Sequence, residues 1–177
     1  MKTINYLLAL LFLCGFLQLS GQEIKLDVPF VPTPQKVVEG MLELAKVGKG
    51  DVVYDLGCGD GRIVITAAKK YGATGVGVDL NPVRIEEAKE NAKEAKVEKK
   101  VTFYEGNLFD FDFSKATVLT LYLFPEINLK LMPKILAEMK PGSRVVSHAF
   151  DMGSWKPDKE ILVDGISIFL WTIPEKK

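Results

Sequence analysis

A cluster of aspartates and glycines in the first half of the sequence is well suited to chemistry. The segment 55–62 reads Asp-Leu-Gly-Cys-Gly-Asp-Gly-Arg, and a further acid, Asp79, stands 22 positions after Gly57. Glycines let the backbone turn tightly and let a ligand approach it closely. Carboxylates bind cations and accept hydrogen bonds from hydroxyl groups. The combination predicts a nucleoside-binding site where a strand gives way to a helix.

The spacing of the glycines separates two kinds of cofactor. A dinucleotide fingerprint reads G-x-G-x-x-G, whereas here Gly61 comes one residue early and Arg62 fills the expected place. Asp60 stands near the start of the following helix, where it would repel a pyrophosphate. S-adenosylmethionine has no phosphate and carries a sulfonium and an ammonium, which suit the neighbouring Asp55 and Asp60. We therefore predict S-adenosylmethionine as the cofactor.

Two further loops are expected to complete the cofactor site. Asp79 ends the second strand, where a carboxylate accepts the ribose hydroxyls; its alternative role is to cap the helix that follows. Asn107 after the third strand is expected to bind the adenine amino group, with an Asx turn as the alternative, and Leu108 is expected to pack on the ring. The predicted cofactor-binding residues are Asp55, Gly57, Cys58, Gly59, Asp60, Gly61, Asp79, Leu80, Asn107, Leu108 and Tyr122.

The acceptor of the methyl group is expected at the ends of the fourth and fifth strands. Tyr122 is the first choice for orienting an amine or for forming an aromatic channel for a cation, although a core tyrosine fits equally well. Asp151 is a weaker choice as proton acceptor, and the only histidine, His148, is more typical of a structural role. The predicted substrate-binding residues are Pro32, Pro125, Asn128, His148 and Trp155, and no metal site is predicted.

The elements that position these residues alternate between strands and helices. Apolar runs predict strands at 51–56, 74–79, 101–105, 117–124 and 143–149, and a hairpin of 161–163 and 166–172 around Asp164-Gly165. Helices are predicted at 60–71, 82–96 and 126–139, after a first helix that Thr33 caps and Pro34 begins. This order predicts a Rossmann-like α/β fold: a mostly parallel seven-stranded sheet, helices on both faces, and a C-terminal antiparallel hairpin.

Composition limits the classes of function. The chain has 177 residues, which favours one domain, and 47% of them are hydrophobic, enough for a sizeable core. Lys plus Arg and Asp plus Glu both number 23, so no net basic field attracts nucleic acid. Of the two cysteines, Cys14 precedes the domain and Cys58 lies in the glycine loop, which gives no support for a disulfide.

The N-terminus resembles a targeting segment. Lys2 precedes an apolar run at 6–19, followed by small residues, as in a secretory signal. The run is shorter than the roughly 20 residues of a usual membrane helix, but Leu19 is poorly placed for cleavage, so an uncleaved anchor stays open. We expect a leader at 1–21, a Pro-rich connector at 22–35 and the cofactor-binding domain at 36–177, either exported to the periplasm or held at a membrane.

These residues together resemble a known family. The glycine loop with Asp79 resembles class I methyltransferases in general, and it stands together with the segments 28–32, 55–64, 81–82, 121–123 and 144–148. More narrowly, they resemble the mitochondrial protein-lysine methyltransferases that modify the ATP synthase c-subunit and the adenine nucleotide translocase, and their prokaryotic relatives. The resemblance implies a lysine side chain of a protein as acceptor. The alternatives are a small-molecule methyltransferase, a non-catalytic binding module of the cell envelope and, least favoured, a nicotinamide-dependent oxidoreductase.

Overall fold

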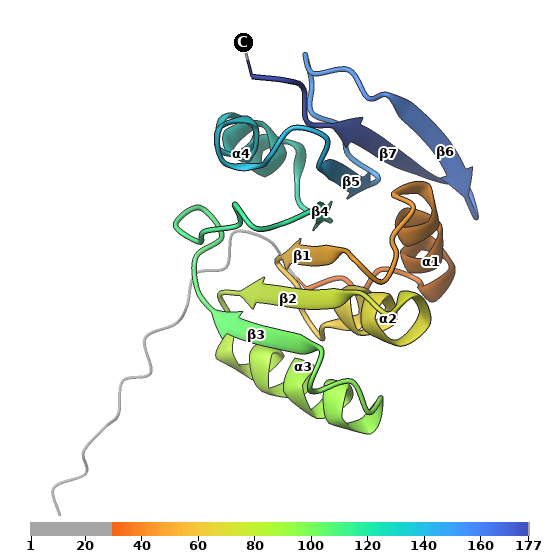
Figure 1. Cartoon of the computed structure of the whole chain (residues 1–177), viewed down its shortest axis with the longest axis vertical. Coiled ribbons are helices and arrows are strands. Elements are labelled where there is room, and N and C mark those ends of the chain that lie inside the picture. Colours follow the sequence, from red (N-terminus) through yellow and green to blue (C-terminus); the bar gives the residue numbers. More distant parts are fainter. Residues whose placement is uncertain (1–29, 177) are drawn as a thin grey trace, which may run out of the picture.

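One seven-stranded sheet forms the centre of the computed structural model, which describes residues 30–176 (Figure 1). The strand order is β3-β2-β1-β4-β5-β7-β6, and every pairing from β3 to β5 is parallel. The last two strands pair antiparallel, as the predicted hairpin requires. The strands are β1 (Val52–Leu56), β2 (Thr74–Asp79), β3 (Val101–Glu105), β4 (Val118–Leu121), β5 (Arg144–His148), β6 (Lys159–Val163) and β7 (Ile166–Thr172).

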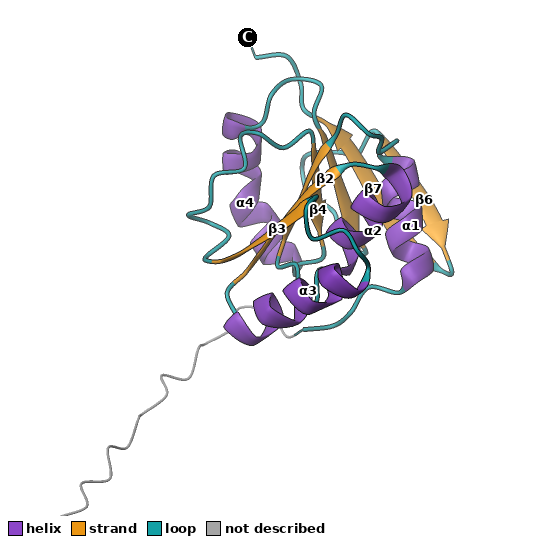
Figure 2. Ribbon diagram, turned by 60° about the horizontal axis from the view of Figure 1, so that its bottom comes forward, coloured by secondary structure: helices purple, strands orange, loops and turns teal. Residues whose placement is uncertain are grey.

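Helices cover both faces of the sheet, which confirms the predicted class of fold (Figure 2). The helices are α1 (Gln35–Leu44), α2 (Arg62–Tyr71), α3 (Pro82–Glu94) and α4 (Pro125–Glu138). Apolar residues of the first three belong to one buried cluster, whereas those of α4 belong to a second cluster with Trp171 of β7 and Phe113. The sheet therefore lies between two cores, each formed by one apolar side of its strands.

The start of α1 differs from the sequence prediction. The sequence predicts Thr33 as the cap of this helix, but Pro34 occupies the N-cap position and makes no side-chain hydrogen bond there. The Thr33 hydroxyl instead lies 3.1 Å from Nδ1 of His148, and both side chains are almost completely buried. A tertiary partner has replaced the local capping bond, because a buried histidine nitrogen needs a partner that water cannot supply.

The fourth strand is also shorter than predicted. β4 ends at Leu121 instead of Phe124, and Phe124 is already the N-cap of α4, with Pro125 as the first helical residue. Proline favours the first position of a helix, because its fixed φ fits and its missing N–H would have no helical partner there. The residues 122–124 are thereby released from the sheet to line the crevice beyond it.

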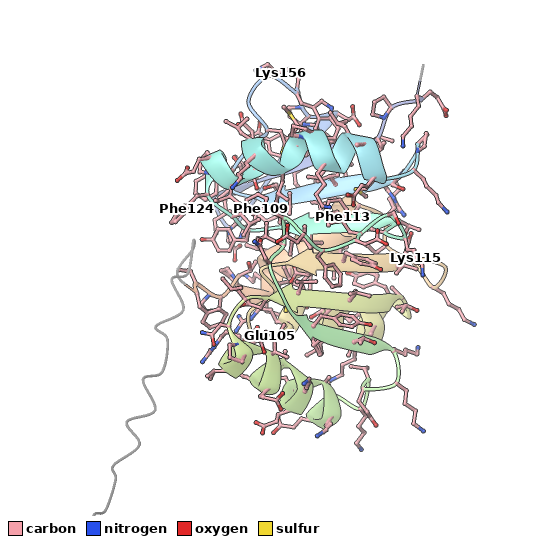
Figure 3. All side chains as sticks on the ribbon, turned by 90° about the vertical axis from the view of Figure 1, so that its left-hand side faces the viewer. Glu105, Phe109, Phe113, Lys115, Phe124 and Lys156 are labelled. Carbon is pink, nitrogen blue, oxygen red and sulfur yellow. The ribbon has the colours of Figure 1, made fainter. Side chains whose placement is uncertain are left out.

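The carboxyl ends of the parallel strands lie at one edge of the sheet. In Figure 3, Lys115, just before β4, and Phe124, just after it, mark opposite sides of the molecule. The neighbours of β1 are β2 and β4, so the chain order reverses there, and open α/β sheets bind ligands at such a point. Within residues 30–176, no helix has the length and apolarity that a membrane span requires.

Candidate active site

The glycine loop between β1 and α2 forms the floor of a cavity at this edge. Amide groups of Gly57 and Cys58 donate to the carbonyl oxygen of Val78 at 2.8 and 2.9 Å, which ties the loop to β2. The amide of Gly61 donates to the carbonyl oxygen of Cys58 at 2.9 Å and closes a tight turn. Bonds between backbone groups therefore set much of the path of the loop.

Two of the glycines are required by their surroundings. Gly61 has φ +76°, and a Cβ there would lie 2.7 Å from the Phe103 ring. Gly59 has φ +52°, and a Cβ there would lie 2.3 Å from the ring of Phe30. A positive φ strains any residue that carries a Cβ, and at Gly61 the buried ring of Phe103 also leaves no room for one. The glycine at position 61 therefore corresponds to a packing requirement.

Asp79 holds two loops together at the cavity. One carboxylate oxygen accepts from the Gly59 amide at 2.8 Å, and the other accepts from the Asn81 amide at 2.9 Å. Both of the roles considered from the sequence are therefore compatible with its position, because each carboxylate oxygen has a second lone pair. The oxygens are fixed by backbone groups at the place where ribose hydroxyls are expected.

Asp55 is the most perturbed acid of the site. Its side chain is only 3% exposed, and the Thr120 hydroxyl donates to it at 2.6 Å. Burial raises the pKa of Asp55 to about 7, the Thr120 bond opposes the shift, and the charges of Asp79 and Asp60 add to it. A half-ionised carboxylate beside two others makes the cavity floor attractive to a cation.

Asp60 is paired more closely than the sequence suggested. Nε of Arg62 donates to its carboxylate at 2.9 Å, and Nη1 of the same arginine donates to the Thr33 carbonyl at 3.0 Å. This pairing neutralises part of the charge that was expected to repel a pyrophosphate. The electrostatic case for a cationic ligand therefore depends mainly on Asp55 and Asp79.

An aromatic wall faces the glycine loop across the cavity. Tyr122, Phe124 and Phe150 all line it, and the rings of Tyr122 and Phe150 are 6.4 Å apart with an angle of 18° between them. Behind Tyr122, the imidazole of His148 stacks at 3.7 Å, and burial lowers the pKa of that imidazole to about 4. The wall is therefore aromatic, and burial keeps the imidazole behind it in its neutral form.

A strained turn brings Phe150 to this wall. Ala149 has φ +65°, and the amide of Phe150 donates to the carbonyl oxygen of His148 at 2.8 Å. The amide of buried Asn128 donates to the carbonyl oxygens of Phe150 and Asp151 at 3.5 and 3.4 Å. Such backbone strain costs on the order of 1–3 kcal/mol and is concentrated at functional sites.

Comparisons with known proteins match this arrangement. The model of the ANTKMT methyltransferase domain family matches residues 55–159. A "Protein-lysine N-methyltransferase" of Saccharolobus islandicus is 48% identical over 85% of this chain and 96% of its own length. The chain belongs to the ANTKMT methyltransferase family. It is an S-adenosylmethionine-dependent methyltransferase.

Two further proteins are similar to this chain. The human lysine N-methyltransferase of the ATP synthase c-subunit is 35% identical over 76% of this chain, which spans 57% of that enzyme's length. A crystal structure of a Salinibacter ruber protein with S-adenosyl-L-homocysteine shares 53% identity and has a TM-score of 0.82. It covers 83% of this chain and 96% of its own, and it is described as an RNA methyltransferase.

The cavity of the methyltransferase fits a cofactor of this kind. It has carboxylates at its floor for a sulfonium and an ammonium, a cradle without Cβ atoms, and fixed acceptor oxygens on Asp79. S-adenosylmethionine supplies an electrophilic methyl group when bound. Asp55 and Asp79 are the residues that would hold its charged and hydroxyl groups in this cavity.

Most of the predicted cofactor-binding residues lie against the cavity. Gly59 and Gly61 shape its floor without appearing among the residues that line it. Oδ1 of Asn107 accepts from the Phe109 amide at 3.0 Å, so the Asx turn considered as an alternative is present. The predicted residues that line the cavity are Asp55, Gly57, Cys58, Asp60, Asp79, Leu80, Asn107, Leu108 and Tyr122.

The predicted acceptor residues are only partly brought together. Pro32 lines the cavity with Tyr122, whereas Pro125, Asn128, His148 and Trp155 do not. Trp155 packs against Trp171 at 5.8 Å, and its carbonyl oxygen accepts from the indole of that residue. The carboxylate of Asp151 accepts from the Gly153 amide at 3.0 Å and is not among the lining residues.

Several residues that were not predicted from the sequence reach the cavity from distant parts of the chain. Phe30 of the connector lies over Gly59, and the guanidinium of Arg84 is 4.8 Å from its ring. Phe150 arrives through the turn at Ala149, which no sequence signal marked. The remaining lining residues are Val31, Thr33, Arg62, Ile63, Val78, Asn81, Gly106, Leu123 and Phe124. The proximity of Pro32 to the domain was the one signal that the connector takes part.

Proposed function

We propose that this methyltransferase transfers the methyl group of S-adenosylmethionine to the side-chain amine of lysine in a protein substrate. The observation that carries the proposal is the uncharged aromatic wall of Tyr122, Phe124 and Phe150 opposite the acidic floor. Aromatic faces attract ammonium groups through their quadrupole. The names of the Saccharolobus and human relatives, both lysine methyltransferases, support the same acceptor.

The reaction requires the lysine to lose its proton before it attacks. A free lysine has a pKa of about 10.4 and is almost fully protonated at neutral pH. The charge of the sulfonium and the loss of water around the lysine inside the cavity both disfavour the ammonium; together they outweigh the attraction of the aromatic faces and lower the pKa of the lysine. The neutral amine would then take the methyl group that the cofactor supplies, and S-adenosylhomocysteine would leave. The contribution of this chain's own residues is to orient, desolvate and position the amine.

Asp151, the predicted proton acceptor, is not among the residues that line the cavity. The carboxylate of Asp151 already accepts from the Gly153 amide and lies on an exposed loop. Tyr122 lines the cavity, and its side chain is half-buried. We therefore assign Tyr122 to orienting the amine and propose that the proton leaves to water, with Asp151 as its acceptor only if the loop moves.

Label transfer tests the acceptor. The purified chain is incubated with cell extract and S-adenosylmethionine carrying a tritiated methyl group, and the products are divided by protease, by ribonuclease and by lipid extraction. We expect label in protein that is released as methyllysine on acid hydrolysis. The variant Asp79→Ala is the control, because it should transfer no label. Label confined to lipid or small molecules would contradict the proposal.

RNA is the second acceptor that this experiment separates. The description of the Salinibacter relative as an RNA methyltransferase favours it. Against it stands the balance of 23 basic and 23 acidic residues, which gives no field for the phosphate backbone. Label that ribonuclease releases, and that protease leaves intact, would replace the lysine proposal with this one.

We also propose that the leader at 1–21 holds the domain at a membrane or directs its export. These residues lie outside the part that the structure describes, and the proposal comes from the cationic start and apolar run alone. Mass spectrometry of the mature N-terminus, combined with cell fractionation, tests it. A full-length chain found only in the soluble cytosolic fraction would contradict both forms of the proposal.

A further inference from the structure

A second row of side chains stands behind the aromatic wall. His148 is 3% exposed and does not line the cavity, yet its ring stacks on Tyr122 at 3.7 Å with an angle of 23°. Strands β4 and β5 pair in register up to Leu121 and Ser147, so these two rings occupy the next pair of positions. The imidazole is therefore a plate that supports the tyrosine from behind.

A residue of the connector holds this plate, the His148 ring, in place. The Thr33 hydroxyl lies 3.1 Å from Nδ1 of His148, and the carbonyl oxygen of the same threonine accepts from Arg62 at 3.0 Å. Thr33 is 4% exposed, so water does not compete for its hydroxyl. One residue of the connector thus contacts both the glycine-loop side, through Arg62, and the aromatic side, through His148.

We propose that His148 is a positioning residue for Tyr122, and that the Thr33 hydroxyl sets the orientation of its ring. This inference rests on the proposed function, because Tyr122 is assigned to the acceptor amine. His148 does not reach the reacting atoms, since Tyr122 lies between it and the cavity. A neutral plate is also the chemistry that the wall needs, because an imidazolium there would repel both the sulfonium and the incoming amine.

The geometry predicts a definite order of effects. His148→Ala removes the plate, and kcat should fall by about 10–100-fold, because small misplacements of a group that orients the reactants are this costly. Thr33→Val keeps the shape but removes the hydroxyl, and kcat should fall by about 3–10-fold, the usual effect of one hydrogen bond. His148→Phe keeps the stack but removes the ring nitrogen that the Thr33 hydroxyl contacts, and it should match Thr33→Val.

A double-mutant cycle tests whether His148 acts through Tyr122. The same His148→Ala change is made in a Tyr122→Ala background, and kcat, KM and the affinity for S-adenosylmethionine are measured in full-length protein. We expect no further loss of kcat in that background and an affinity for the cofactor within about twofold of the parent, since coupled residues are not additive. An equal loss in both backgrounds would show that His148 acts independently and would overturn the proposal.

Two controls separate positioning from a loss of folding and from a wrong acceptor. Ser143→Ala removes another buried hydroxyl, bonded to the Ala116 carbonyl at the opposite end of β5, and should leave kcat unchanged. The NMR shifts of the Tyr122 ring report the stack without any acceptor, and both His148→Ala and Thr33→Val should move them. If the Tyr122 ring shifts do not change in these variants, the positioning role is overturned even if lysine is methylated. If the shifts change but the chain does not methylate lysine, the positioning role is supported and only the acceptor proposal fails.

Discussion

The two sides of the cavity differ in what holds their shape. On the glycine-loop side, hydrogen bonds from backbone amides hold the loop in place. Gly57 and Cys58 donate to the Val78 carbonyl oxygen, and Gly59 donates to the Asp79 carboxylate. On the aromatic side, contacts between side chains hold the shape of the wall, through the stacking of the Tyr122 ring on the His148 ring. A site whose shape depends on backbone hydrogen bonds tolerates few substitutions of its glycines. A site whose shape depends on side-chain contacts can change its specificity by single substitutions.

The difference also has a chemical meaning. The cofactor is the same for all enzymes of this kind, so a rigid floor with carboxylates at fixed places suits it. The acceptor varies between relatives, whose names include lysine and RNA methyltransferases. An aromatic wall formed by the two segments that follow β4 and β5 is a natural place for such variation, because binding sites on loops can change without disturbing the core.

The largest effect should come from Asp79 on the cofactor side. Asp79→Ala removes both fixed acceptor oxygens, and the affinity for S-adenosylmethionine should fall at least about 100-fold, because hydrogen bonds to a charged group contribute on the order of 1.5–3 kcal/mol each. Titration calorimetry measures it. Asp112→Ala is the matched control, since that carboxylate accepts from the Ser114 amide in an exposed loop away from the cavity. Equal affinities for the two variants would break the comparison.

The stability of the protein should also be sensitive to a methyl group added on the glycine-loop side. Gly61→Ala introduces a Cβ at φ +76° against Phe103, and the free energy of unfolding should fall by about 2–4 kcal/mol from conformational strain and overpacking together. Gly142 has φ +79° with open space around it, so Gly142→Ala should lose only the conformational part, about 1–2 kcal/mol. Urea denaturation compares the two, and equal losses would remove the packing argument.

A smaller effect is expected in the pH dependence of cofactor binding, which should involve the glycine-loop side and not the aromatic side. Burial raises the pKa of Asp55 to about 7, and a cationic cofactor favours the ionised carboxylate, so binding releases a proton below that pH. The affinity for S-adenosylmethionine should therefore fall by up to about tenfold per pH unit as the pH decreases below 7. The effect of Asp55 on the stability of the unliganded protein has the opposite pH dependence. The folded state favours the protonated carboxyl group, so its contribution to stability is complete below pH 3.8 and is lost as the pH rises through about 7.

Asp55→Asn isolates this group. The variant should bind the cofactor with an affinity that hardly changes between about pH 6 and 8, measured by calorimetry in buffers of different ionisation enthalpy. The aromatic side provides the contrast, because the pKa of His148 is lowered to about 4 and this group does not titrate in that range. A slope that survives in Asp55→Asn would show that another group carries the proton.

Most of the glycine-loop side could be predicted from the sequence. Its residues are close together in the chain, and their types are required by local backbone geometry, as the positive φ of Gly61 illustrates. The order of strands and helices was predictable for the same reason, since hydrophobic periodicity is a local signal. The boundaries of β4 and α1 were not, because Pro125 and the Thr33–His148 contact decided them.

The aromatic side could be predicted only in outline. Tyr122 was found because it ends a strand at the crevice, but its support comes from residues 26 and 89 positions away in the chain, His148 and Thr33. The strained turn at Ala149 has no signal at all, since alanine is not typical of a positive φ. Contacts between distant segments depend on the folded arrangement, which a single sequence does not display.

A crystal structure of this chain with S-adenosyl-L-homocysteine would show directly how the cavity binds the cofactor. We expect the ribose hydroxyls on the Asp79 carboxylate, the amino group beside Asp55, and the sulfur atom facing Tyr122. A ligand bound elsewhere, or one whose sulfur faces away from the aromatic wall, would contradict it.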